Sequence, residues 1–221
     1  MFLIPHQQKE KLRQQWYELI RAIAVRAECA TEVWLVLEKH YSEPHRSYHN
    51  LSHVHALLTQ AENARSAIRD FPVIALAIWF HDLIYDTRRH DNELKSAELA
   101  AVLMSRLGID VPVIQNVQQC ILATARHEVP VNKKIAPDLP FFLDLDLAIL
   151  GTTTDFYQQY SQAIRNEYRW VPAPLFRAGR VKVLKRFAER EKLFFTPAMA
   201  ERFDVQARAN LAWEIKKLTF F

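Results

Sequence analysis

The amino-acid sequence predicts an all-α protein. Half of its 221 residues are hydrophobic, which is enough for a sizeable core, and only three are glycine: Gly108, Gly151 and Gly179. So few glycines argue against a turn-rich β-sandwich and against a glycine-lined phosphate loop. Apolar residues recur along most of the chain at the spacing of amphipathic helices. Because a chain of this length fits one large domain, we expect a single bundle of about nine or ten helices over residues 1–221.

Three helices are expected before residue 70, with one clear loop among them. Leu12, Trp16 and Ile20 follow the helical spacing in the first helix. The loop covers 41–50, because Pro44 and its polar or basic neighbours cannot sustain a helix. The expected helices are 7–26, 32–40 with Thr31 as its cap, and 51–68 with Asn50 as its cap.

The next helix is expected to lie at the centre of the core. Asp70 precedes Phe71 and Pro72, a typical helix start in which the carboxylate caps free amides and proline is tolerated in the first turn. The residues from Pro72 to about Tyr85 are apolar on all sides, which is typical of a helix surrounded by others. His81 and Asp82 stand side by side where this apolar run ends.

The rest of the chain is also expected to be helical. Gly108 should close the helix that Asp91 or Asn92 begins. A loop is expected over 129–140, and the prolines within 171–174 should interrupt the helical pattern. The remaining elements are 92–107, 110–127, a short apolar run over 141–150 that Gly151 ends, 152–170, a basic amphipathic helix over 175–192, and helices over 197–203 and 204–218.

The composition favours a soluble protein of the cytoplasm. Cys29 and Cys120 form no CxxC pattern and no disulfide framework, which suits a reducing compartment. The N-terminus lacks the pattern of a signal peptide, and no apolar run approaches the length of a membrane span. The net charge of +4 mildly favours anionic partners such as phosphorylated small molecules or nucleic acid.

Four side chains of metal-binding type lie beside apolar helices: His53, His81, Asp82 and Asp146. Two imidazoles and two carboxylates form a mixed nitrogen and oxygen set that suits Mn, Fe, Zn or Mg. A metal bound by such a set suits hydrolysis, because the ion lowers the pKa of bound water and neutralises charge on a phosphoryl oxygen. Taken alone, the His81 and Asp82 pair is equally consistent with a structural ion pair at a helix end.

The order His, then His-Asp, then a distant Asp resembles the HD superfamily of metal-dependent phosphohydrolases. The resemblance extends to YHNLSHVHALL (48–58), FHDLIYD (80–86), DNELKSAELA (91–100), ILATARHEV (121–129), FLDLDLAILG (142–151) and ARANLAWEI (207–215). It therefore covers most of the chain. It implies a helical domain of the HD type whose metal-site core lies at about 45–170, with the helices of 174–218 packed on it.

Carried over residue by residue, the resemblance implies that His53, His81, Asp82 and Asp146 hold one divalent ion, which is Mn, Fe, Mg, Zn, Co or Ni. His49 competes with His53 for the first position, but Asn50 as a helix cap leaves His49 in the loop. The following residues are candidates for supporting the site or contacting substrate: His49, Asn50, Tyr85, Glu93, Asp144, Arg177 and Arg180.

Several of these candidates have a structural alternative. Some HD proteins hold a second metal through additional histidines, and around the usual places this chain offers Glu93 and His127. Glu93 equally suits helix capping, and His127 equally suits a helix C-terminus. Asp144 is either a supporting group or a helix start. The basic helix that carries Arg177 and Arg180 is either a solvated face or a phosphate-binding edge.

The expected function is hydrolysis of a small phosphorylated molecule, with a nucleotide as the favoured class. In this interpretation Asp82 orients the attacking water, and His127 or a C-terminal arginine stabilises the leaving phosphate. The alternative is a protein of the same fold that binds a metal or a nucleotide without turnover. Nucleic-acid binding through the basic C-terminal helix ranks last. The sequence leaves the substrate, the metal and the oligomeric state open.

Overall fold

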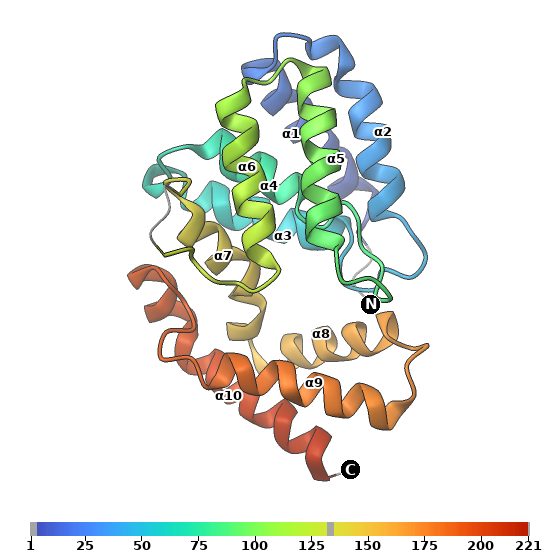
Figure 1. The fold of residues 1–221 in the computed structure, drawn as a ribbon, viewed down its shortest axis with the longest axis vertical. Helices are drawn as coiled ribbons and strands as arrows, with labels where there is room; N and C mark the ends of the chain where they lie inside the picture. The colour runs from blue at the N-terminus through green and yellow to red at the C-terminus, as the bar shows by residue number, and fades with distance from the viewer. Residues whose placement is uncertain (1–3, 132–134, 221) are drawn as a thin grey trace. The chain divides into compact units, whose positions relative to one another are not determined.

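A computed structural model describes residues 4–131 and 135–220, and all regular structure in these ranges is helical (Figure 1). The predicted all-α class is therefore confirmed, with ten α-helices and no strand among the described residues. Contacts within the chain define two compact units, an N-terminal one that ends at Phe142 and a C-terminal one that begins at Leu143. This boundary falls inside the predicted core of 45–170.

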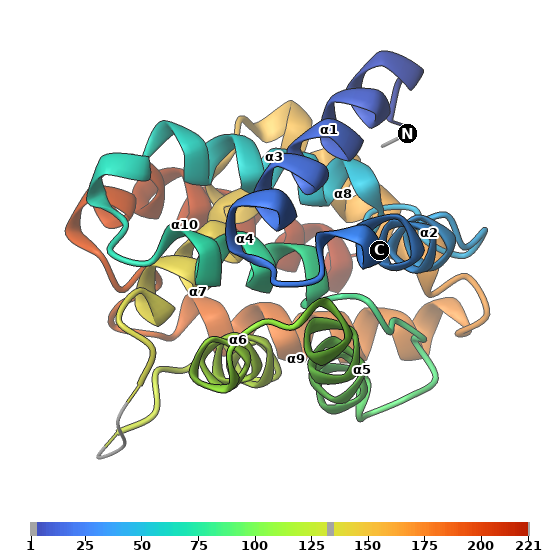
Figure 2. The same ribbon diagram turned by 90° about the horizontal axis from the view of Figure 1, so that it is seen from above.

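Six helices and the start of a seventh form the N-terminal unit. Figures 1 and 2 show α5 and α6 side by side, and these two helices pack against each other directly. The helices are α1 (His6–Ile23), α2 (Ala30–Tyr41), α3 (Leu51–Asn63), α4 (Phe71–Phe80), α5 (Asn92–Leu107), α6 (Val111–Thr124) and α7 (Leu139–Leu147), whose last residues belong to the C-terminal unit. Short 3-10 turns cover Ala27–Cys29 and Arg65–Ala67.

The α4 helix is the core of the N-terminal unit, as its apolar sequence predicts. Every residue from Val73 to Phe80 is buried, and α3, α5 and α6 pack around it. The rings of Trp16 and Trp34 meet Trp79 edge to face, with centroids 5.6 and 6.0 Å away. Apolar as it is, α4 is only 10 residues long, and no helix in the described ranges combines the length and hydropathy needed to cross a membrane.

The capping residues at three helix ends agree with the sequence. The side chain of Asn50 accepts the amide of Ser52, and that of Asp70 accepts the amide of Val73. Gly108 closes α5 in the left-handed region, with φ of 73°. The predicted cap at Thr31 is wrong, because the 3-10 turn before α2 runs straight into the helix and α2 already begins at Ala30.

The end of α4 also differs from the sequence prediction. The helix ends at Phe80 rather than at about Tyr85. Beyond it, the carbonyl oxygens of Asp82 and Leu83 accept N–H groups from the side chain of Arg46. The amide of Ile84 donates to the hydroxyl of Ser96. These side chains use the backbone groups that further helical turns would need, so His81 and Asp82 lie at a helix end.

The C-terminal unit contains α8 (Thr154–Glu167), α9 (Ala173–Ala188), α10 (Pro197–Phe220) and a 3-10 turn over Ala148–Gly151. Both α8 and α9 pack against α10. The sequence suggested two helices where α10 is a single one. Asp204, at the expected break, pairs with Arg208 one turn later through an N–O distance of 2.7 Å, so the helix continues through it.

The Gly151→Ala substitution should lower the free energy of unfolding by roughly 1–3 kcal/mol, since overpacking forces the backbone apart. A methyl group at Gly151 would lie 2.6 Å from the carbonyl oxygen and from Cβ of Phe203 on α10. Gly179 on α9 is the matched control, because a methyl group there meets nothing within 4 Å. Gly179→Ala should instead stabilise the protein by about 0.5–1 kcal/mol. Urea unfolding followed by circular dichroism measures both, and equal effects would contradict this packing.

Candidate metal centre

Three side chains of the N-terminal unit converge on one point: His53 from the first turn of α3, His81 from the end of α4, and Asp82 beside it. The Nε2 atoms of the two histidines are 3.1 Å apart. The Oδ2 atom of Asp82 is 3.0 Å from Nε2 of His81 and 3.7 Å from Nε2 of His53. Both histidines are buried, whereas the side chain of Asp82 keeps 19 % of its exposure. The cluster is therefore open to solvent on its carboxylate side.

The backbone around α4 fixes the tautomer of His81. Its Nδ1 atom lies 3.0 Å from the carbonyl oxygen of Ile78, one turn earlier in the same helix. A carbonyl oxygen only accepts, so Nδ1 carries the proton and donates it. In the neutral ring, Nε2 then presents its lone pair to His53 and Asp82. Metal-binding histidines typically show this arrangement, in which the second ring nitrogen is held by a carbonyl or carboxylate.

The separations of the three atoms suit a divalent ion. With metal–ligand bonds of about 2.1 Å, neighbouring ligand atoms lie about 3.0 Å apart in an octahedral site and about 3.4 Å apart in a tetrahedral one. The observed separations are 3.0, 3.1 and 3.7 Å. Two imidazole nitrogens and a carboxylate oxygen at such distances repel one another unless a proton or a cation lies among them. The residues present therefore fit a bound metal.

The charge state of Asp82 is that of a ligand. Burial alone would raise the pKa of its carboxyl group, but His81, His49 and His53 in their protonated, positively charged form, together with a hydrogen bond from His81, hold this pKa well below its usual value. The carboxylate thus stays ionised at neutral pH. An ionised carboxylate next to two imidazoles is a hard oxygen and nitrogen ligand set, which Mn, Fe, Co, Ni, Zn and Mg all accept.

Aromatic rings from the 41–50 loop and from the turn after α4 surround this cluster. The ring of His49 stacks on that of Tyr85 with centroids 4.2 Å apart. The same His49 ring lies 5.9 Å from the ring of His53, and Tyr48 lies 4.8 Å from His53. His49 and Tyr85 both retain partial exposure. His49 and Tyr85, two of the seven residues that the sequence suggested as supporting the site or contacting substrate, are therefore at the edge of the histidine cluster.

Other predicted residues of the N-terminal unit lie outside the trio. Asn50 serves as the N-cap of α3. Glu93 lies in the first turn of α5, where a carboxylate interacts well with the helix dipole. His127 follows the end of α6 with φ of 49°, and its amide donates to the carbonyl of Ala123. Ligand or catalytic roles for Glu93 and His127 stay predictions.

The predicted residues of the C-terminal unit include two with clear structural partners there. Asp144 accepts the amides of Phe195 and Thr196 at 2.7 and 2.8 Å, just before α10 begins. Burial raises the pKa of Asp144 in spite of these bonds. Arg180 forms a buried ion pair with Glu214. These contacts favour structural roles for Asp144 and Arg180.

The remaining predicted residues, Asp146 and Arg177, also belong to the C-terminal unit. Asp146 lies near the end of α7, and Arg177 lies partly exposed on α9. Their predicted roles, as a further metal ligand and as a substrate contact, stay predictions.

Sequence reasoning missed Arg46, whose side chain is fully buried. Its guanidinium donates to the carbonyl oxygens of His49, Asp82 and Leu83 at 3.1, 2.6 and 2.9 Å, and it pairs with Glu43 at 2.9 Å. The only signal in the sequence is an arginine three residues before His49, inside a loop that looks solvated. Its partners at Asp82 and Leu83 come from a distant segment, so local sequence could not reveal its role.

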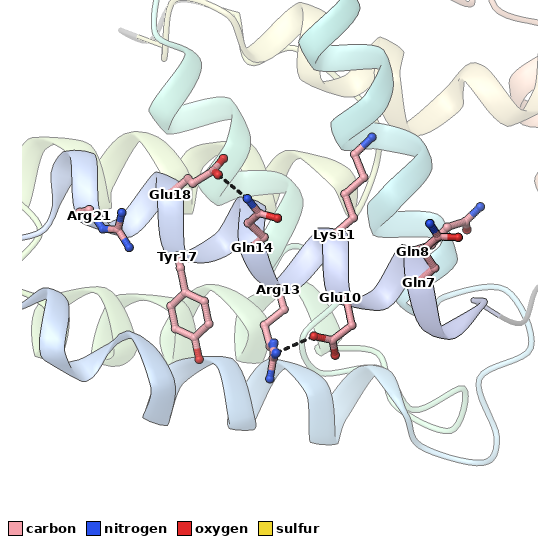
Figure 3. Close-up of a pocket in the computed structure, with 9 residues that line it drawn as sticks. All are labelled: Gln7, Gln8, Glu10, Lys11, Arg13, Gln14, Tyr17, Glu18 and Arg21. Carbon is pink, nitrogen blue, oxygen red and sulfur yellow. Dashed lines mark hydrogen bonds and ion pairs between the residues drawn. The ribbon is translucent and has the colours of Figure 1, made fainter.

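A hollow along α1 lies apart from this cluster. Figure 3 shows nine side chains along the outer face of that single helix, around a hollow of about 690 Å³. Within it, Arg13 bonds to Glu10 and Gln14 to Glu18, so the charged groups there largely satisfy one another. Neither His53, His81 nor Asp82 lines this hollow. The hollow is therefore not part of the candidate metal centre.

Comparisons with protein-family models, with curated proteins and with solved structures each gave no match. The resemblance to the HD superfamily accordingly stays a prediction from the sequence. What stands on the geometry alone is a buried histidine pair and a carboxylate whose ligand atoms lie close enough together that they could hold one metal ion.

Proposed function

We propose that this protein is a metal-dependent phosphohydrolase of the cytoplasm, acting on a small phosphorylated molecule, with a nucleotide as the favoured class. The observation that carries the proposal is the convergence of His53, His81 and Asp82, whose ligand atoms lie 3.0 to 3.7 Å apart. The free thiols of Cys29 and Cys120 are compatible with a reducing compartment. Asp146, on the family pattern, is the expected further ligand.

A divalent ion in this position supplies acidity to a coordinated water and charge neutralisation to a phosphoryl group. The protein contributes the geometry. His81, fixed by Ile78, and His53, held in the first turn of α3, keep their nitrogen atoms aimed at the same point. The Asp82 carboxylate, which stays ionised, accepts a hydrogen bond from the attacking water and orients it.

The edge of the cluster is suited to binding the substrate. His49 and Tyr85 are partly exposed and stacked, so their polar atoms can meet a phosphate while their rings keep a fixed orientation. Flat aromatic surfaces beside a phosphate site also favour a substrate with a planar base. This arrangement supports a nucleotide over a simple sugar phosphate.

Turnover by metal-loaded protein tests the proposal. Protein stripped with a chelator is loaded separately with Mn, Fe, Co, Ni, Zn or Mg and assayed for phosphate release from nucleotides, sugar phosphates and pyrophosphate compounds. We expect at least one pair of metal and substrate to turn over. His53→Ala should remove that activity, since it deletes a ligand, whereas the exposed His90→Ala should retain it.

Two outcomes would count against hydrolysis. Tight nucleotide binding in calorimetry without any product would support the alternative, a binding protein that uses the same cluster. Activity that survives His53→Ala unchanged would place the chemistry elsewhere in the chain.

A further inference from the structure

Arg46 is an unusual residue for a loop between helices. Its side chain has 0 % exposure, although burying a guanidinium is costly unless its donors are paired. The carboxylate that pairs with it is that of Glu43, which is 34 % exposed. Its other partners described above are three backbone carbonyl oxygens. Closing the loop alone does not require a buried guanidinium, so its partners indicate a further role.

The three carbonyl groups belong to the segments that carry the metal centre. One is the carbonyl of Asp82 itself, another is that of Leu83, and the third is that of His49. A single Nη1 atom donates to both His49 and Asp82. The guanidinium therefore links the 41–50 loop to the turn that follows α4, across 36 residues of sequence.

Aromatic rings hold the guanidinium in its place. Its central carbon lies 5.2 Å from the ring centroid of Tyr41 and 5.5 Å from that of Tyr85, within the range of cation–π attraction. The Tyr41 hydroxyl donates to the carbonyl of Trp79, and a ring nitrogen of His45 lies 2.7 Å from the carbonyl oxygen of Tyr85. Tyr41 is thus bonded to the end of α4, and Tyr85 lies in the turn beyond α4, where His45 bonds to it.

We propose that Arg46 is the positioning residue of the metal centre, an inference that rests on the proposed function. Arg46 touches neither the ion nor the substrate. By occupying the carbonyls of Asp82 and Leu83 it takes the acceptors that the amides of residues 86 and 87 would need if the helix continued through this turn. This turn directs the Asp82 carboxylate at the imidazoles of His53 and His81. Through its bond to the carbonyl of His49, the same guanidinium also holds His49, which lies at the edge of the cluster.

The geometry required of a metal site explains why such a clamp matters. Ligand atoms must lie within about 0.2 Å of their bonding distances, and a supporting group that is loose by more than about 0.5 Å weakens a site. Without Arg46, the carbonyls of Asp82 and Leu83 lose their donors, and the turn rearranges to satisfy them. Loss of such outer partners typically lowers metal affinity about 10–100-fold.

The test compares the dissociation constant for Mn, measured by calorimetry, with stability in urea. Arg46→Ala should bind Mn about 10–100-fold more weakly than the parent. Arg46→Lys keeps the charge but not the forked donors, so it should recover only part of this loss. Millimolar guanidinium, too dilute to denature, should restore Mn affinity in Arg46→Ala by filling the vacated site.

Leu107→Ala is the control for destabilisation alone. Leu107 is fully buried at the last turn of α5, about 22 Å along the helix from Asn92 at its start. This variant should lose stability as a buried leucine does, yet keep the parent's dissociation constant and show no response to guanidinium.

The outcomes separate this inference from the proposed function. If Arg46→Ala binds Mn as the parent does, or if Leu107→Ala loses affinity to the same extent, Arg46 is a structural residue only and the inference fails. If the parent binds Mn but hydrolyses nothing, the proposed function fails while the positioning role is still decided by the affinities. A parent that binds no divalent ion overturns both.

Discussion

His81→Ala should weaken binding of a divalent ion by more than about 100-fold, because it removes a ligand outright, and loss of an outer partner alone typically costs about 10–100-fold. His81 contributes an Nε2 atom within 3.1 Å of His53 and within 3.0 Å of Asp82. Its ring is also held by the carbonyl of Ile78, which keeps Nε2 directed at the other two side chains. Turnover should be lost together with affinity.

Calorimetric titration of chelator-treated protein with Mn and with Zn measures this effect. His90→Ala is the control, since His90 is an exposed histidine outside the cluster and its removal leaves the ligand set intact. We expect the control to bind with the parent's affinity. A His81→Ala protein that binds as tightly as the control would mean that the cluster is an ion-pair network and not a metal site.

Arg180→Met should lower the free energy of unfolding by about 3–5 kcal/mol, because it leaves a buried carboxylate without its partner. The guanidinium binds both oxygens of Glu214, at 2.9 and 3.1 Å, and the two side chains are 10 % and 1 % exposed. Tyr157 and Ser161 donate to the same carboxylate. Removal of Arg180 therefore disturbs a network that joins α8, α9 and α10.

Two variants make this prediction specific. Arg186→Met, on the exposed side of α9, should change stability by less than about 0.5 kcal/mol. The double variant Arg180→Met with Glu214→Met should be more stable than Arg180→Met alone, since it removes the unpaired charge as well. Urea unfolding provides all of these values. If Arg180→Met is as stable as Arg186→Met, the ion pair contributes little and a substrate role for Arg180 regains weight.

The same ion pair predicts how stability depends on pH. Burial alone would raise the pKa of Glu214, but Arg180 and the hydroxyls of Tyr157 and Ser161 hold it below its ordinary value. Because the folded pKa is depressed, the contribution is fully present above the pKa of an unfolded glutamate. It is lost as the pH falls through the lower, folded value. Arg180→Met should therefore show a weaker decline of stability in this acidic range than the parent.

Helix starts and stops were predictable from sequence wherever the signal is local. Asn50 and Asp70 cap helices through amides two and three residues away, and Gly108 ends α5 because glycine readily adopts its positive φ. The apolar run of α4 likewise revealed its central place in the core. In each case the residues that determine the structure are neighbours in the chain.

Features that depend on distant partners could not be predicted. The end of α4 at Phe80 is associated with Arg46, which lies more than 30 residues earlier, in the loop expected over 41–50. Asp144 receives its amides from residues 51 and 52 positions further on. In the sequence Arg180 belongs to a basic helix, whereas in the structure it pairs with the buried Glu214. Charged residues that form such networks carry no local signature.

For the candidate site, the sequence identified three of the clustered side chains better than their surroundings. His53, His81 and Asp82 were chosen by chemistry and by a family resemblance, and they do lie together. The pairing of Nδ1 of His81 with Ile78 and the stacking of His49 on Tyr85 depend on side-chain orientations. These orientations follow from packing and not from sequence spacing, which is why only the structure reveals them.

Pulsed electron paramagnetic resonance of the Mn-loaded protein tests the central claim most directly, because it counts imidazole nitrogens bound to the ion. We predict one Mn per chain with two bound imidazoles, those of His53 and His81. In His81→Ala, any Mn loaded at high concentration should show a single imidazole. A parent spectrum without nitrogen coupling, or one that His81→Ala leaves unchanged, would contradict the assignment of this cluster as a metal centre.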